Sequence, residues 1–155
     1  MGVSKVYELP GLAIIELEAG YGGSMAYIIG CFMASLSFLI NRAMLKRLGP
    51  RVIVSMSPAV EELAKTGLAY WLDADILVTH MVFGLIEAIY DYRVSGSIRA
   101  AAASITGHAF FGAVTVFILS ASESLWLSWL SACAIHICWN VSAVLLTKSR
   151  KDNIK

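Results

Sequence analysis

The sequence predicts an all-α membrane protein: a single domain over residues 1–155, built as a bundle of about five transmembrane helices with an intramembrane polar site. Two observations predict this class. Hydrophobic residues make up 58% of the chain and charged residues only 15%, whereas soluble domains carry about 25% charged residues. The apolar residues also gather into runs of the length that a helix needs to cross about 30 Å of hydrocarbon. The expected helices cover residues 24–45, 52–72, 76–92, 100–119 and 125–147.

Polar or helix-breaking residues separate these runs. Residues 11–20 are too acidic for a span and are expected to form an interfacial or looping segment. The second run contains Pro58, which removes a backbone hydrogen bond and predicts a kink. A polar tail is expected at 148–155, and no internal repeat is visible. The polar or helix-breaking segments that follow the five runs are, in order, residues 46–51, 73–75, 95–97, 120–124 and 148–155.

The basic residues predict the orientation of the bundle. Ten of the twelve fall at the end of the first run or in the loop after it, in the loop after the third run, or in the tail. With five spans these three segments lie on one side, and basic loops favour the cytoplasm. The N-terminus is therefore expected outside and the C-terminus inside. Trp71, Trp126 and Trp129 lie near the expected outer ends, as in an aromatic belt.

The second run is unusual because Glu61, Glu62 and Lys65 interrupt its apolar sequence. A charged group near the bilayer centre costs on the order of 3 kcal/mol even on lenient insertion scales. One glutamate and Lys65 have a purely structural interpretation as an ion pair. That interpretation does not cover both glutamates, because neighbours on a helix point about 100° apart.

Polar residues on the other helices lie at a similar depth. Counted from the cytoplasmic end of each helix at about 1.5 Å per residue, Glu62, Glu87, His108, His136 and Asn140 lie about 8–16 Å deep. A single histidine is more simply explained as a hydrogen-bonding contact between helices. Five such groups at one depth instead indicate a functional site.

Several other residues receive structural interpretations. His80 is expected to be interfacial or to support the site from outside it. Gly84, Gly107 and Gly112 are expected where helices pack closely. The three cysteines are expected to be small buried hydrophobic residues, and their odd number excludes complete pairing within one chain.

The chemistry that fits these groups is attack of water on a carbonyl. A desolvated carboxylate can act as a general base, and imidazole and amide groups can donate to an oxyanion. The sequence has no G-x-S-x-G and no H-E-x-x-H. No cofactor is expected. Zinc is not excluded, because histidines and carboxylates are competent ligands, although the fixed cation of Lys65 would repel a metal.

The chain resembles a known family at four places. Glu61-Glu62-Leu63-Ala64-Lys65 is similar to the EExxK motif of PrsW-type intramembrane proteases, and Phe83–Glu87 to their FxxxE motif. His108 and the segment His136–Asn140 resemble the later histidine motifs. The wider superfamily of CAAX-processing and bacteriocin-processing (CPBP) proteases has EExxxR, FxxxH and HxxxN. This chain keeps the last of these and departs from the first two.

The resemblance implies roles for six residues. Glu61 or Glu62 would activate water, with Glu61 preferred, and Glu87 would share or tune the proton. His136 and Asn140 would hold the oxyanion, assisted by His108. The substrate would be a membrane-embedded or juxtamembrane peptide or protein. The chain would be an integral protein of a prokaryotic cell membrane.

Two other functions stay open. One is a small proton-coupled transporter, in which carboxylates and histidines form a relay. The other is a non-catalytic binding or immunity protein on the same scaffold. No basic patch with interleaved aromatic residues suggests a nucleic-acid partner. Oligomeric state and substrate identity are not predicted.

Overall fold

The computed structural model describes residues 8–9, 12–13 and 21–152. The described part of the chain is a helical bundle preceded by two short antiparallel strands of two residues each, β1 (Glu8–Leu9) and β2 (Leu12–Ala13). Most of the expected acidic segment 11–20, the first seven residues and residues 153–155 lie outside the described residues. The five helices of the described part are α1 (Tyr21–Leu48), α2 (Pro50–Trp71), α3 (Ile76–Ser95), α4 (Ile98–Ser122) and α5 (Leu125–Asp152).

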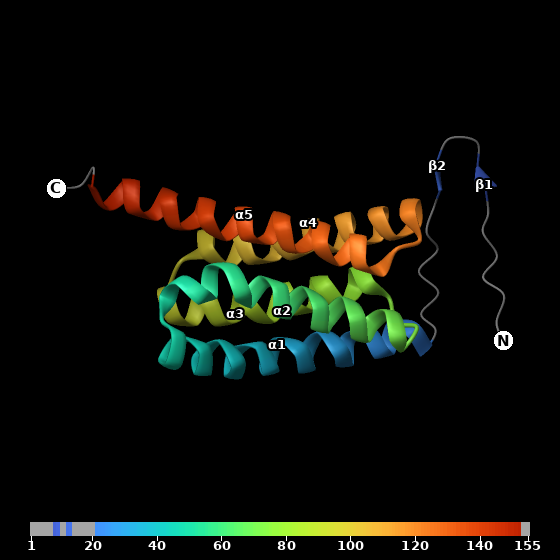
Figure 1. Cartoon of the computed structure of the whole chain (residues 1–155), viewed down its shortest axis with the longest axis horizontal. Coiled ribbons are helices and arrows are strands. Elements are labelled where there is room, and N and C mark those ends of the chain that lie inside the picture. Colours follow the sequence, from blue (N-terminus) through green and yellow to red (C-terminus); the bar gives the residue numbers. More distant parts are fainter. Residues whose placement is uncertain (1–7, 10–11, 14–20, 153–155) are drawn as a thin grey trace.

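The helices run roughly along one common axis and are joined by short turns (Figure 1). α3 packs against α1 and α4, and α2 packs against α1 and α5, so α2 and α3 are the two central helices. α2 begins with Pro50 after Gly49 and continues through Pro58 to Trp71. α5 continues past Thr147 into the basic segment that follows it.

Three helical segments are long and apolar enough to cross a membrane: Gly23–Leu48, Ile98–Ser122 and Leu125–Leu146. They indicate an integral membrane protein. α2 and α3 differ from them because of their charged residues. Glu61, Glu62 and Lys65 lie within the last part of α2, and Glu87, Asp91 and Arg93 lie close together in α3.

The interior of the described bundle is unusually polar. Besides four glycines and Pro58, its buried residues comprise twelve that are polar or charged and ten that are hydrophobic. The large apolar side chains instead lie outside: Phe32 is 59% exposed, Phe117 68% and Leu146 72%. This distribution is the reverse of that in a soluble domain, and it suits a lipid environment. The expectation of buried cysteines is therefore wrong for Cys31 and Cys138, which are exposed, while Cys133 is buried.

α3 and α4 pack closely through two reciprocal pairs of glycine and histidine. A Cβ atom at Gly84 would lie 2.6 Å from the Cβ of His108, and one at Gly112 would lie 2.7 Å from the Cβ of His80. Gly107 meets Trp139 at 3.1 Å. The prediction that these three glycines mark close helix packing is confirmed. Their lack of a side chain is what places both histidines inside the bundle.

The turns on either side of α3 fix its ends. The Asp75 carboxylate accepts a hydrogen bond from the backbone N–H of Val78, which caps the helix start. Gly96 closes the other end in the left-handed conformation at φ 66°, where glycine has no steric penalty. Ser97 then caps α4 by accepting from the N–H of Ala100. These caps define a short connection, so α3 and α4 run antiparallel.

The close packing of α3 and α4 predicts the effect of an added methyl group. Gly84→Ala should lower the free energy of unfolding by about 1–3 kcal/mol, because the added carbon overlaps the His108 side chain. Thermal unfolding of the purified protein in detergent measures this. Gly67→Ala is the matched control: that position is inside α2 with nothing within 4 Å. The control should be neutral or stabilise by about 0.5–1 kcal/mol. Equal melting temperatures for the two variants would contradict the packing argument.

Candidate functional site

The candidate site is centred on Glu62, whose side chain is 0% exposed. One carboxylate oxygen, Oε1, lies 2.8 Å from the Lys65 Nζ and 2.8 Å from the His136 Nδ1. The partners come from the next turn of α2 and from α5. Because an ionised carboxylate only accepts hydrogen bonds, His136 carries its proton on Nδ1 in this contact. Glu62 therefore joins two helices through one oxygen atom.

Lys65 is also fully buried, and its ammonium contacts three groups. Besides Glu62, the Nζ lies 2.9 Å from the His108 Nδ1 and 4.3 Å from the centre of the Phe83 ring. A lysine ammonium has only donors, so the His108 Nδ1 accepts from it. Lys65 therefore pairs with Glu62 at i,i+3 and bonds to α4, while its aromatic contact comes from α3.

His108 links this buried pair to Glu87. The His108 Nε2 lies 2.6 Å from the Glu87 Oε2, and the Glu87 side chain is 31% exposed. Hydrogen bonds thus run without a break from Glu87 through His108, Lys65 and Glu62 to His136. This series of hydrogen bonds begins at the partly exposed Glu87 carboxylate and ends at the buried His136 imidazole.

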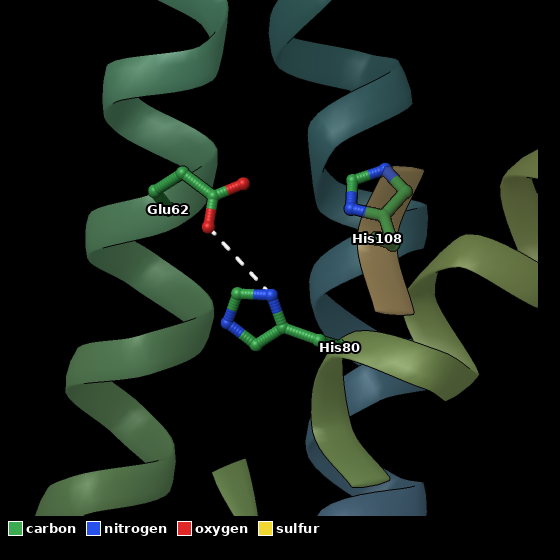
Figure 2. A group of neighbouring side chains, drawn as sticks. All are labelled: Glu62, His80 and His108. Carbon is green, nitrogen blue, oxygen red and sulfur yellow. Dashed lines mark ion pairs between the residues drawn. The ribbon is translucent and has the colours of Figure 1, made fainter. Parts of the chain in front are cut away.

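His80 lies beside the second oxygen of the Glu62 carboxylate, Oε2, whereas His136 bonds to Oε1. Figure 2 shows the His80 ring directed at the Glu62 carboxylate, with His108 across from them. The His80 Nδ1 lies 3.7 Å from the Glu62 Oε2, and neither atom has a hydrogen-bond partner. The other ring nitrogen, Nε2, lies 3.1 Å from the Thr66 Oγ1. His80 is 0% exposed, and its contact with Glu62 agrees with the second of the two expectations, a residue that supports the site.

A cavity of about 190 Å³ lies next to the buried network. Four of the six residues predicted for the site border it: Glu87, His108, His136 and Asn140. Glu62 is not at its wall, and His136 connects the two. Small residues of α4 and α5 leave the space open. The remaining lining residues are Asp91, Ala100, Ala103, Ser104, Gly107, Phe111, Trp139 and Ala143.

Glu61 occupies a different environment. Its Oε1 accepts hydrogen bonds from the Asn41 Nδ2 at 2.7 Å and the Ser57 Oγ at 2.8 Å. Ser57 also hydrogen-bonds to the Asn41 Oδ1. Glu61 therefore faces α1, and its hydrogen bonds are to amide and hydroxyl groups. The two neighbouring glutamates point to different sides of α2.

Two features of the sequence indicate a buried position for His80 near the site. His80, Phe83, Gly84 and Glu87 recur at helical spacing on one face of α3, so His80 shares a face with a predicted site residue. Gly112 also lies one turn from His108, which allows a bulky side chain of α3 to approach there. The distance of His80 from the expected end of the helix predicts its position less well than these two features.

The geometry allows two kinds of chemistry. A carboxylate that holds the Nδ1–H of an imidazole orients that ring and stabilises its protonated form, so His136 can take a proton on its other nitrogen. Separately, Glu62, His80 and His108 offer ligand atoms that all lie within 4.8 Å of one another. This is the one such group of histidine, cysteine and carboxylate side chains within the described residues.

Comparisons with known proteins do not assign the chain to a family. No protein-family model, no curated protein and no solved structure matches it. What this site does must therefore be inferred from its geometry.

The buried ion pair predicts how the protein responds to removal of one partner. Lys65→Met leaves the Glu62 carboxylate in the interior without its cation and should cost on the order of 3–5 kcal/mol of stability. Thermal unfolding in detergent measures this loss. The double variant Lys65→Met with Glu62→Gln should recover much of it, because no charge is then left unpaired. Lys46→Met, at an exposed position in the last turn of α1, is the control and should change little.

Proposed function

We propose that the chain is an intramembrane protease that hydrolyses peptide bonds of membrane-embedded or juxtamembrane substrates. The observation that carries the proposal is the Glu62–His136 hydrogen bond at the edge of a cavity that Asn140, His108 and Glu87 also line. An imidazole oriented by a fully buried carboxylate, together with an amide that borders the same cavity, forms a set suited to attack of water on a carbonyl.

The proposal includes five membrane-spanning helices, with α2 and α3 crossing alongside the three apolar helices. The charges of α2 do not oppose this, because Glu61 is 7% exposed and Glu62 and Lys65 are 0% exposed. Such residues face the bundle and not the lipid. The large apolar residues that both helices expose include Leu63, Leu68 and Leu85. The basic loops favour a cytoplasmic C-terminus and an outer N-terminus, which is the orientation of this proposal.

In the proposed mechanism His136 takes a proton from water in the cavity. Glu62 holds the Nδ1–H of the ring and stabilises the imidazolium that forms, as the carboxylate of a catalytic triad does. Glu62 is thus the glutamate that activates water, in place of Glu61, and it acts through His136. Asn140 lines the same cavity, and its amide would donate to the oxyanion. His136 then gives the proton that it took from water to the leaving amine, and Glu87, joined to His108 at 2.6 Å beside the same cavity, can share that proton.

A proton-coupled carrier is the second candidate. The observation that favours it is the unbroken series of hydrogen bonds from Glu87 through His108, Lys65 and Glu62 to His136. Such a series can relay protons through a membrane protein. A carrier would move protons in sealed vesicles without cleaving any peptide, and a protease would cleave in detergent without a gradient. The two assays separate the candidates.

The mechanism predicts unequal effects for the two neighbouring glutamates. Glu62→Gln should abolish cleavage of a panel of transmembrane peptides, because the amide cannot stabilise a charged His136. Glu61→Gln should keep most of the activity, since its partners are Asn41 and Ser57. Asn140→Ala should lower the rate by about 10²–10³ through loss of an oxyanion donor. A dead Glu61→Gln with an active Glu62→Gln would reverse the assignment.

A chelator separates the glutamic mechanism from a metal-dependent one. With Glu62 and His136 as the proton-accepting pair, treatment with a chelator should not lower the cleavage rate. A rate that disappears with chelator and returns with zinc would overturn the glutamic assignment, and Glu62, His80 and His108 would then be ligands.

The proposed topology predicts opposite accessibility for two turns. A single cysteine placed at Asp73, between α2 and α3, should react with an impermeant reagent from outside intact cells. A cysteine at Arg99, at the start of α4, should react only after the membrane is opened. Both variants should be made in a background without the three native cysteines. Labelling of both positions from the same side would show that α3 does not span.

A further inference from the structure

We infer that Glu62, His80 and His108 form a binding site for one divalent transition-metal ion such as Zn²⁺, which binds in competition with the ammonium of Lys65. This site is additional to the proposed cleavage of peptides and does not depend on it. Its ligands come from three helices, α2, α3 and α4, and all three side chains are buried (Figure 2).

The first argument is the pair of unsatisfied atoms between Glu62 and His80. Buried polar atoms almost always have a partner, and an unpaired one calls for a water or an ion. The Glu62 Oε2 and the His80 Nδ1 both lack a hydrogen bond and lie 3.7 Å apart. Zinc bonds to nitrogen and oxygen are each about 2.0–2.2 Å long. One ion slightly off the line between these atoms therefore reaches both without a movement of either helix.

The second argument is the partner on the far nitrogen of each histidine. Histidines that bind a metal usually donate their other N–H to an oxygen, which fixes the tautomer and turns the lone pair toward the metal. The His80 Nε2 lies 3.1 Å from the Thr66 Oγ1, and the His108 Nε2 lies 2.6 Å from the Glu87 Oε2. Both histidines therefore have this outer contact in place. Two histidines and one carboxylate form a common ligand set for zinc.

The third argument concerns the atom that now faces His108. The Lys65 Nζ lies 2.9 Å from the His108 Nδ1 and 2.8 Å from the Glu62 Oε1. The Nδ1 lone pair is thus already directed at a cation, and that cation stands between two of the three ligands. A metal ion placed there would have to displace the ammonium. Lys65 therefore limits the affinity of the site, and its removal should raise it.

Metal binding would also affect the proposed reaction. The ion would withdraw electron density from the Glu62 carboxylate, which accepts the Nδ1–H of His136, and would weaken that hydrogen bond. Added Zn²⁺ should therefore slow peptide cleavage, and chelator should restore the rate.

The decisive experiment is calorimetric titration of Zn²⁺ into the full-length protein in detergent, without substrate. All variants carry Cys31→Ser and Cys138→Ser, because these two thiols are exposed and would bind zinc. Lys65→Met should bind one equivalent, about tenfold or more tighter than the protein with Lys65, because a like charge is removed. Adding His80→Ala or His108→Ala should abolish that binding. Equal binding with and without these histidines would overturn the site.

A further variant tests the hydrogen bond between Thr66 and the far nitrogen of His80. Thr66→Val keeps the size of the side chain but removes the oxygen from His80, and should weaken zinc binding by about 10–100-fold. Thr115→Val is the matched control, because Thr115 is also a buried threonine and its hydroxyl bonds to its own helix at Phe111. It should leave the affinity unchanged. Equal affinities for the two variants would contradict the role of Thr66.

Lys65→Met is expected to lower stability, so a second measurement uses protein that retains Lys65. Zn²⁺ should still raise the melting temperature of this protein, and His80→Ala should remove that rise. A rise that survives His80→Ala would overturn the site. Zinc binding by a protein that cleaves no peptide would refute the proposed function alone, and cleavage without zinc binding would refute this inference alone.

Discussion

The structure depends on the burial of one ammonium group. Lys65 is 0% exposed in a bundle whose outer surface is apolar, and an unpaired charge there would be prohibitively costly. Three groups around the Nζ offset that cost: the Glu62 carboxylate, the His108 Nδ1 and the Phe83 ring. Because these groups come from α2, α3 and α4, satisfying one cation fixes three helices relative to one another.

The same requirement explains the packing of α3 against α4. His108 reaches Lys65 only because Gly84 leaves room for its Cβ, and His80 reaches Glu62 beside Gly112 in the same way. The glycines therefore do more than bring two backbones together. They admit two imidazole rings to the centre of the bundle. In a membrane, where apolar contacts between helices offer little advantage over lipid, such polar contacts help to specify the arrangement.

The site combines a satisfied network with one place that is not satisfied. Glu62 Oε1, Lys65 and His108 have their partners, while Glu62 Oε2 and the His80 Nδ1 face each other without any. The satisfied side leads through His136 to the cavity, where the proposed chemistry takes place. The unsatisfied side is the proposed metal position. One carboxylate thus has a different role on each of its two oxygens, and Lys65 links the two sides.

The sequence by itself determined the helical bundle and its polar centre. Apolar runs of spanning length, broken at Gly49, Gly96 and similar turns, predict helices because a membrane requires every backbone group to be paired within its segment. Charges inside an apolar run must be shielded from lipid, so the burial of Glu62 and Lys65 also followed from the sequence. The depth argument likewise grouped Glu62 with Glu87, His108, His136 and Asn140; the last four border one cavity, whereas Glu62 lies behind His136 and not at the wall.

Only the tertiary structure decided which of the two glutamates contacts His136 and His80. Glu61 and Glu62 are chemically identical neighbours about 100° apart on one helix, and the helix that each one faces is set by packing. α1 brings Asn41 to Glu61, and α5 brings His136 to Glu62. His80 was placed by the same packing: its distance from the end of α3 suggested the surface, but Gly112 of α4 opened the interior to it. Rotation of helices about their axes is a long-range property, because it depends on residues far apart in the chain.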